Sequence, residues 1–132
     1  MIVVDTSIVV AIIRSEPDAP QWLDVLDRAR KSSMSVLSYI ETHMVITGPR
    51  GDAESRRIAD FLKAMRIAIV PVTLDQEAVA ITSFMKYGKG RYPARLNPAD
   101  CFSYALAKTR RLPLLFKGDD FAKTDIVPAW RP

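Results

Sequence analysis

The chain has 132 residues, of which 48% are hydrophobic and 26% charged, and a formal net charge of +4 that is compatible with a polyanionic partner. A single cysteine excludes an internal disulfide framework, and no apolar run approaches the roughly 20 residues that cross a membrane. The amino terminus also lacks the pattern of a signal peptide, so we expect one cytoplasmic globular domain, residues 1–132.

The first predicted element is a short strand at residues 2–4, where three consecutive large apolar residues indicate burial on both faces. The strand runs directly into Asp5, Thr6 and Ser7, whose side-chain oxygens can accept hydrogen bonds from the first turn of a helix. Asp5 is therefore expected at the carboxyl end of a central strand. In open α/β sheets, ligands bind at that edge.

Helices and strands alternate along the rest of the chain. The third helix is expected to start with a capping box formed by Ser38 and Glu41, and the sixth with Asn97 as its cap. This alternation predicts a three-layer α/β/α domain with a mostly parallel sheet of four to five strands. The predicted helices are 8–14, 18–31, 38–47, 52–65, 73–87 and 97–110, and the further strands are 33–37, 67–72, 113–116 and, at the edge, 126–127.

Acidic residues recur next to the ends of the predicted strands. Taken singly, each acid has a plain structural explanation as a helix cap, a first-turn acid or a turn residue. In a parallel sheet, however, the strand ends meet at one edge, so their coincidence favours a shared site. The four acidic positions expected there are Asp5, Glu41, Asp100, and Asp119 or Asp120.

Such a cluster has a chemical consequence. Carboxylates within a few ångströms repel one another, and some would take up protons unless a cation were bound. Hard oxygen ligands of this kind are typical of Mg²⁺ or Mn²⁺ sites. A bound ion of that kind could activate a water molecule and hold a phosphate oxygen.

Four segments in combination resemble the PIN-domain family, and more closely the VapC-type toxins of bacterial toxin–antitoxin pairs. The resemblance runs from end to end of the chain and implies a Mg²⁺- or Mn²⁺-dependent endoribonuclease that hydrolyses RNA phosphodiester bonds. It also implies a homodimer that is held inactive by a co-expressed VapB-type antitoxin. The segments are IVVDTS at 2–7, SYIE at 38–41, LNPADCFSYALA at 96–107 and LLFKGDDF at 114–121.

The resemblance also implies roles for the acids. Asp5 and Asp100 are expected to be the main metal ligands. Glu41 and the fourth acid, Asp120 in preference to Asp119, would complete the ligand set or orient the attacking water as a general base. Thr6 or Ser7 matches a family hydroxyl beside the first acid. One departure is Pro98-Ala99, where related sequences often have glycine before the aspartate.

Three further features of the sequence bear on function. His43 lies two residues after Glu41, on another face of the predicted helix, so a direct chemical role is not expected. Cys101 lies on an apolar helix and is interpreted as a small core residue. The segment 86–95 interleaves cations with two tyrosines, which suits either phosphate contact and base stacking on RNA or a solvated loop over the core.

Two other functions remain open at this level. The first is a catalytically inactive PIN-fold module that binds RNA or an antitoxin, although such a module need not keep four carboxylates in place. The second is a phosphoryl-transfer or phospho-acceptor domain, which also gathers acids at a sheet edge. No glycine-rich phosphate loop is present to support the latter.

Overall fold

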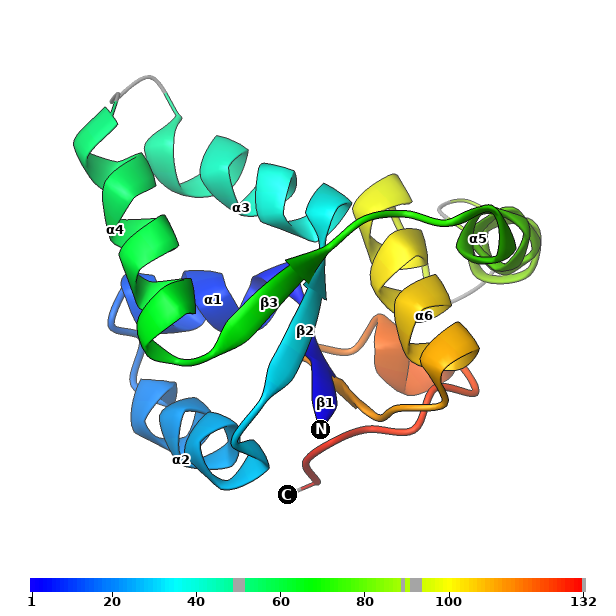
Figure 1. The fold of residues 1–132 in the computed structure, drawn as a ribbon. Coiled ribbons are helices and arrows are strands. Elements are labelled where there is room, and N and C mark those ends of the chain that lie inside the picture. The colour runs from blue at the N-terminus through cyan, green and yellow to red at the C-terminus, as the bar shows by residue number, and fades with distance from the viewer. Residues whose placement is uncertain (49–51, 89, 91–93, 132) are drawn as a thin grey trace.

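The computed structural model describes residues 1–48, 52–88, 90 and 94–131 (Figure 1). Its sheet has the strand order β3-β2-β1-β4, and every neighbouring pair is parallel. The strands are β1 (Ile2–Val4), β2 (Ser32–Ser35), β3 (Ile67–Val70) and β4 (Leu114–Leu115). The helices are α1 (Thr6–Ile13), α2 (Ala19–Ala29), α3 (Val36–Thr47), α4 (Asp52–Ala64), α5 (Leu74–Tyr87) and α6 (Pro98–Arg110), with a short 3₁₀ helix, η1 (Phe121–Lys123).

Strand β1 lies between β2 and β4, as its three apolar residues predict. Val3 pairs with Ser33 on one side and with Leu114 on the other. Side chains alternate across a strand, so β1 contributes to both faces of the sheet. All three of its residues are buried, and the chain leaves the sheet at Asp5.

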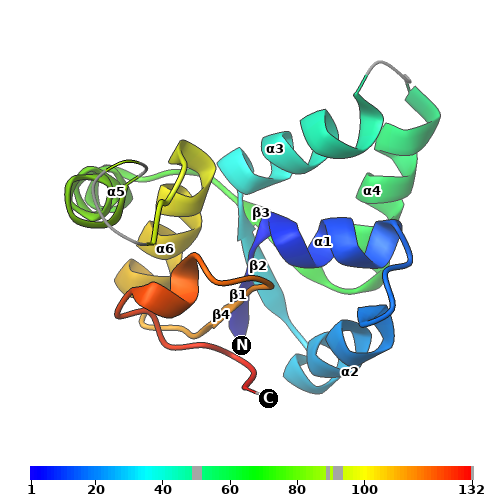
Figure 2. The ribbon, with the colours of Figure 1, turned by 180° about the vertical axis from the view of Figure 1, so that it is seen from behind.

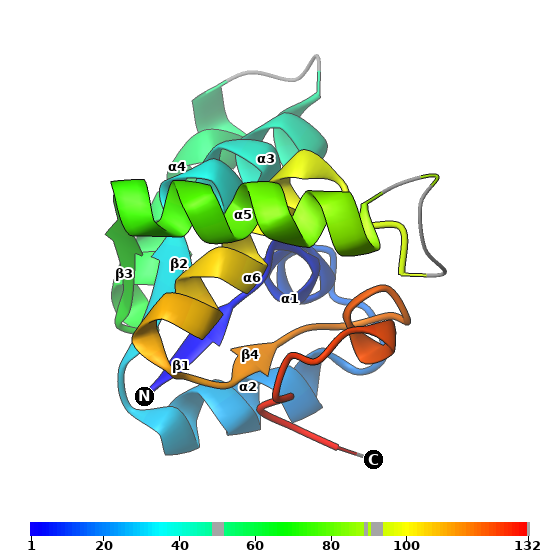
Figure 3. The same ribbon diagram turned by 90° about the vertical axis from the view of Figure 1, so that its right-hand side faces the viewer.

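Two apolar cores lie on the two faces of the sheet, which confirms the three-layer α/β/α arrangement. One core joins Val3 and Leu114 to residues of α5 and α6, and the other joins Val4 and Leu115 to residues of α1, α2 and α4. Figures 1 and 3 show α5 and α6 on one side of the sheet and α1, α2 and α4 on the other. Helix α3 packs against α1, α4 and α6 near the carboxyl edge of the sheet.

The predicted edge strand at 126–127 is wrong, and the sheet has four strands in the described part of the chain. Only an isolated parallel bridge joins Leu114 to Pro128, with Leu114 N–H donating to Val127 O and Ala129 N–H donating to Leu114 O. Both bonds are made by Val127 and Ala129, which flank Pro128, so the pairing with β4 is this single bridge and not a strand.

The predicted capping box at Ser38 is also wrong. Strand β2 ends at Ser35, whose side chain accepts a hydrogen bond from Leu37 N–H and so caps α3. Ser38 therefore lies inside the helix, where it is fully buried. Only Ser38 has a glutamate three residues later, so the capping-box pattern selects it, but the earlier end of β2 makes Ser35 the cap.

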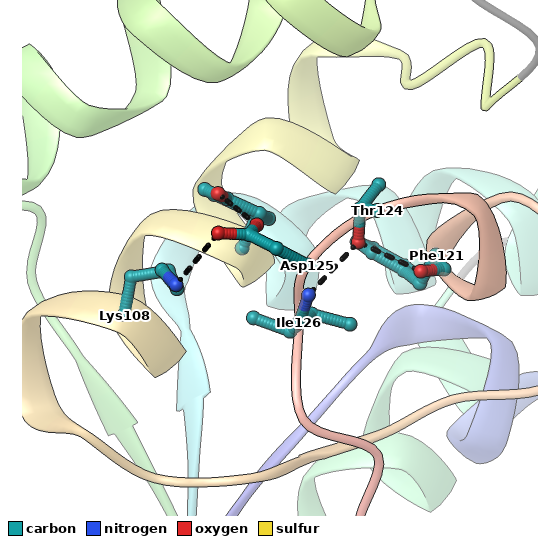
Figure 4. Close-up of polar contacts among 6 residues, drawn as sticks. Lys108, Phe121, Thr124, Asp125 and Ile126 are labelled. Atoms are coloured by element: carbon teal, nitrogen blue, oxygen red, sulfur yellow. Dashed lines mark hydrogen bonds and ion pairs between the residues drawn. The ribbon is translucent and has the colours of Figure 1, made fainter.

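The loop after β4 is tied down by polar contacts (Figure 4). Lys108 Nζ lies 3.0 Å from Asp125 Oδ2, and Thr124 Oγ1 donates to Phe121 O at 2.7 Å and accepts from Ile126 N–H at 3.2 Å. These contacts fix η1 and the residues that follow it against α6. Figure 2 shows this segment, in orange, beside α6. None of the described helices combines the length and the apolar character that crossing a membrane requires.

Candidate active site

Asp5 lies at the carboxyl end of β1 and caps α1. Its carboxylate is 3% exposed and is held by three donors. Oδ2 accepts from Ser7 N–H at 3.0 Å and from Ser7 Oγ at 2.8 Å, while Oδ1 accepts from Ser103 Oγ at 2.8 Å. Ser7 thus is the hydroxyl beside the first acid. Thr6 donates to Ser38 O at 3.1 Å, and its hydroxyl also contacts Glu41, where it opposes the rise in pKa that burial causes.

A pair of buried serines lies behind Asp5. Ser103 has one hydroxyl proton, which it gives to Asp5, so the 2.7 Å contact between Ser38 and Ser103 requires Ser38 to donate. Both residues are fully buried. Sequence reasoning missed this pair because the contact joins α3 to α6 across 65 residues. The only signal was a serine one turn beyond Asp100 on an otherwise apolar helix.

Asp100 opens α6 and forms a capping box with Asn97, the residue predicted as the cap of this helix. Asn97 N–H donates to Asp100 Oδ2 at 2.9 Å, and Asp100 N–H donates to Asn97 Oδ1 at 2.8 Å. The Asn97 side chain also reaches Glu41, with Nδ2 at 3.5 Å from Oε2. Asn97 therefore links the acid of α6 to the acid of α3, a role that its cap position alone did not reveal.

The acids influence one another electrostatically. Burial, reinforced by the charge of Asp5, raises the pKa of Asp100 to about 7, and the charges of Glu41 and Asp120 add to the rise. Burial likewise raises the pKa of Glu41, with a further contribution from Asp5. Such effects require short separations in a poorly hydrated place. Asp5, Glu41 and Asp100 therefore face a common space at the carboxyl edge of the sheet.

The two adjacent acids after β4 have different neighbours. Asp120 is the one whose charge raises the pKa of Asp100. Asp119 instead lines a cavity on the side of the loop that faces α2. The sequence could not separate the two residues, because a shift of one position in the alignment exchanges them.

The donor set fits a hard divalent cation. All four acids offer carboxylate oxygens, which are the ligands that Mg²⁺ and Mn²⁺ prefer. A cation here would relieve the repulsion that favours the protonated form of Asp100. Among the described residues, however, no group of three or more His, Cys, Asp or Glu side chains is already arranged to hold an ion.

The remaining candidates lie outside this space. His43 contacts Ser55 Oγ through Nδ1 at 2.8 Å, and burial lowers its pKa. Cys101 is buried in the core, as expected, and burial raises the pKa of its thiol. Of the segment 86–95, residues 89 and 91–93 lie outside the described residues, while Tyr87 is buried against Tyr104.

Comparison with known proteins gives consistent matches. A model of the PIN domain matches residues 2–127. VapC ribonuclease Mb0640 of Mycobacterium bovis is 42% identical over 130 residues, which cover 98% of this chain and 99% of the relative. Ribonuclease VapC of Mycolicibacterium smegmatis is 43% identical over 125 residues, or 95% of this chain and 97% of the relative.

Solved structures share the fold. The crystal structure of Mycobacterium tuberculosis VapC20, a sarcin–ricin loop cleaving toxin, matches with a TM-score of 0.75 at 18% identity. A toxin–antitoxin complex from Klebsiella pneumoniae matches with a TM-score of 0.73 at 20% identity. Both matches cover 100% of each chain.

The pKa of Asp100 predicts a pH-dependent stability. This carboxyl titrates near 3.8 in the unfolded chain and near 7 in the folded one. Between these values the folded state holds the proton and the unfolded state does not, so stability falls as the pH rises. In EDTA, the free energy of unfolding should drop by about 2–3 kcal/mol between about pH 5 and about pH 8, as urea titration would measure.

Glu41 contributes with the same sign, because its pKa is raised too. Asp100→Asn should remove most of the drop. Asp60→Asn, which changes an exposed carboxylate on α4, should keep it. A stability that rises over this range in the unmodified protein would contradict the proposed crowding of the acids.

Proposed function

The chain belongs to the PIN-domain family, and from that premise we propose that it is a metal-dependent endoribonuclease of the VapC toxin type. The observation that carries the proposal is the convergence of acids at one edge of the sheet, where the charges of Asp5, Glu41 and Asp120 all act on Asp100 and that of Asp5 also acts on Glu41. The curated relatives that match over nearly the whole chain bear the name ribonuclease, which supports the same activity. We take residues 1–132 as one such domain, since the family match spans 2–127.

We propose that Asp5, Asp100 and Glu41 hold Mg²⁺ or Mn²⁺, with Asp120 as the fourth acid. When bound, the ion would polarise the scissile phosphate and lower the pKa of a water molecule. Ser7 and Ser103 fix the orientation of the Asp5 carboxylate through their hydroxyls. Asn97 orients two further carboxylates: its backbone N–H donates to Asp100, and its side-chain amide donates to Glu41.

We assign to Glu41 the role of accepting a proton from the attacking water. Burial raises its pKa toward neutrality, which strengthens it as a base relative to an ordinary carboxylate. Its contact with Asn97 keeps the carboxylate in the shared space while leaving one oxygen uninvolved in that contact. The net charge of +4 supports the approach of RNA to this acidic edge.

We also propose that the protein pairs with a second copy and with an antitoxin. Large apolar side chains are exposed on α3 and α5, among them Met44 at 70%, Ile81 at 58% and Met85 at 59%. Exposed apolar side chains of this size favour a protein partner. The structural match to a toxin–antitoxin complex is consistent with an antitoxin of the VapB type.

The inactive alternative has less support. A module that only bound RNA or antitoxin would have no need for the hydroxyl and amide contacts that orient Asp5, Asp100 and Glu41. Burying the polar groups that make these contacts costs free energy of folding, so their presence supports a catalytic role for the acids.

The principal test is cleavage of RNA by the purified protein. Fragments of transfer, ribosomal and messenger RNA are incubated with Mg²⁺, Mn²⁺ or EDTA. Cleavage should require the metal, and Asp5→Asn should lower the rate by roughly 100-fold or more, because a direct ligand is lost. Asp60→Asn, an exposed acid on α4, serves as the matched control. Cleavage in EDTA that survives Asp5→Asn would overturn the proposal.

A second prediction separates the adjacent acids. The charge of Asp120 contributes to the raised pKa of Asp100, whereas Asp119 lines the neighbouring cavity. Asp120→Asn should therefore reduce kcat at least tenfold more than Asp119→Asn does, a difference of about 1.4 kcal/mol in activation free energy. Equal losses, or a larger loss for Asp119→Asn, would reverse the assignment.

A third prediction concerns Ser103 as a positioning residue. Ser103→Ala removes the donor to Asp5 Oδ1 and should weaken Mn²⁺ binding by roughly tenfold or more, measured by calorimetry without RNA. Ser32→Ala is the matched control, because this buried hydroxyl on β2 makes no hydrogen bond among the described residues. If both variants bind Mn²⁺ like the unmodified protein, Ser103 has no positioning role.

A further inference from the structure

A cavity of about 610 Å³ lies beside the acidic edge and is not part of it. It is bounded by the start of α2, the loop after β4 and the carboxyl-terminal tail. Its apolar walls include three aromatic side chains, Trp22, Phe116 and Trp130. The two indole rings meet edge to face, with centroids 5.3 Å apart and an interplanar angle of 81°. The α2 side of the cavity is thus a rigid aromatic wall.

The cavity is joined to the acidic edge by the loop after β4. Lys117, which lines the cavity, donates its backbone N–H to Ser7 Oγ at 3.0 Å, and Ser7 in turn donates to Asp5. Asp119 also lines the cavity, while the charge of the next residue, Asp120, contributes to the raised pKa of Asp100. A ligand held in the cavity would therefore extend directly toward the proposed catalytic carboxylates.

The polar groups of the cavity complement a nucleotide. Lys117 Nζ is fixed by ion pairs with Glu16 at 2.7 Å and Asp18 at 2.9 Å, so its charge is compensated. Arg131 is exposed at the rim and forms no ion pair with any described residue, which leaves a cation for a phosphate. The indole N–H of Trp22 is directed at Asp18: together with Lys117, which has the larger effect, it lowers the pKa of that carboxyl.

Resting on the ribonuclease activity proposed above, we propose that this cavity binds an unpaired base of the RNA substrate, next to the phosphate that is cut. Proteins recognise single-stranded RNA by stacking splayed bases on aromatic side chains and pairing the backbone with cations. An aromatic wall and an uncompensated arginine occur together here. Continuity with the acidic edge favours the substrate itself over a protein segment as the occupant.

The chain carries its own reporter of this cavity. Its sequence contains two tryptophans, and both line the cavity. Titration of the full-length Asp5→Asn variant with a pool of random single-stranded RNA octamers should therefore quench tryptophan fluorescence saturably. A ribose-phosphate octamer without bases should bind more weakly and quench little. The Asp5→Asn background prevents cleavage, so the measurement reports binding alone.

Kinetics in the otherwise unmodified protein provide the second measurement. Trp130→Ala should lower kcat/KM for RNA cleavage by roughly tenfold or more, as the loss of one base stack predicts. Trp130→Phe retains a stacking ring and should recover most of that loss. Arg131→Ala is a surface change that preserves the fold and should lower kcat/KM several-fold. Arg56→Ala removes the same charge from the exposed side of α4 and should have no effect.

The outcomes separate the cavity from the activity. Metal-dependent cleavage with no quenching, and with unchanged kcat/KM in Trp130→Ala and Arg131→Ala, would overturn the base site while leaving the ribonuclease intact. Quenching by antitoxin peptide but by no RNA would overturn it in favour of a protein-docking site. If none of the RNAs is cleaved, the proposed ribonuclease activity is overturned, and with it the base site that rests on that activity.

Discussion

Repulsion between buried carboxylates is the constraint on which the rest of the structure depends. Asp5 and Asp100 are both buried, and burial together with the charge of Asp5 raises the pKa of Asp100. Such an arrangement lowers stability in the absence of a cation. The fold tolerates it because neighbouring donors, above all Ser7, Ser103 and Asn97, satisfy individual oxygens. Hydrogen bonds thus orient Asp5 and Asp100, while the pKa of Asp100 stays raised.

The parallel sheet explains why these acids meet at all. β1 lies between β2 and β4, so the chain leaves three adjacent strands in the same direction. Asp5 follows β1 directly, Glu41 lies in the helix after β2, and Asp120 lies in the loop after β4. Helix α6 brings Asp100 across the same edge, held to Asp5 through Ser103. Asp5, Asp100 and Asp120 lie where regular structure begins or ends, whereas Glu41 lies in the middle of α3.

The sequence predicted the parts of this arrangement that depend on local chemistry. The apolar triplet at 2–4 predicted a buried strand, and Asn97, Pro98 and Asp100 predicted the start of α6, because each signal lies within a few residues. The contacts of Ser103 with Asp5 and of Asn97 with Glu41 could not be predicted, since they join residues far apart in the chain. The start of α3 was misplaced because Ser38 has Glu41 three residues later and Ser35 has no such acid, so the local pattern favoured the wrong serine.

The position of β4 has a consequence for the order in which the site is built. Of the four strands, β4 is the last to be synthesised, yet it pairs directly with β1, the first. The helices and strands in between can pack as they emerge, but the acidic edge stays incomplete until β4 docks and brings its loop alongside. The acidic edge is therefore completed only after most of the chain has been synthesised.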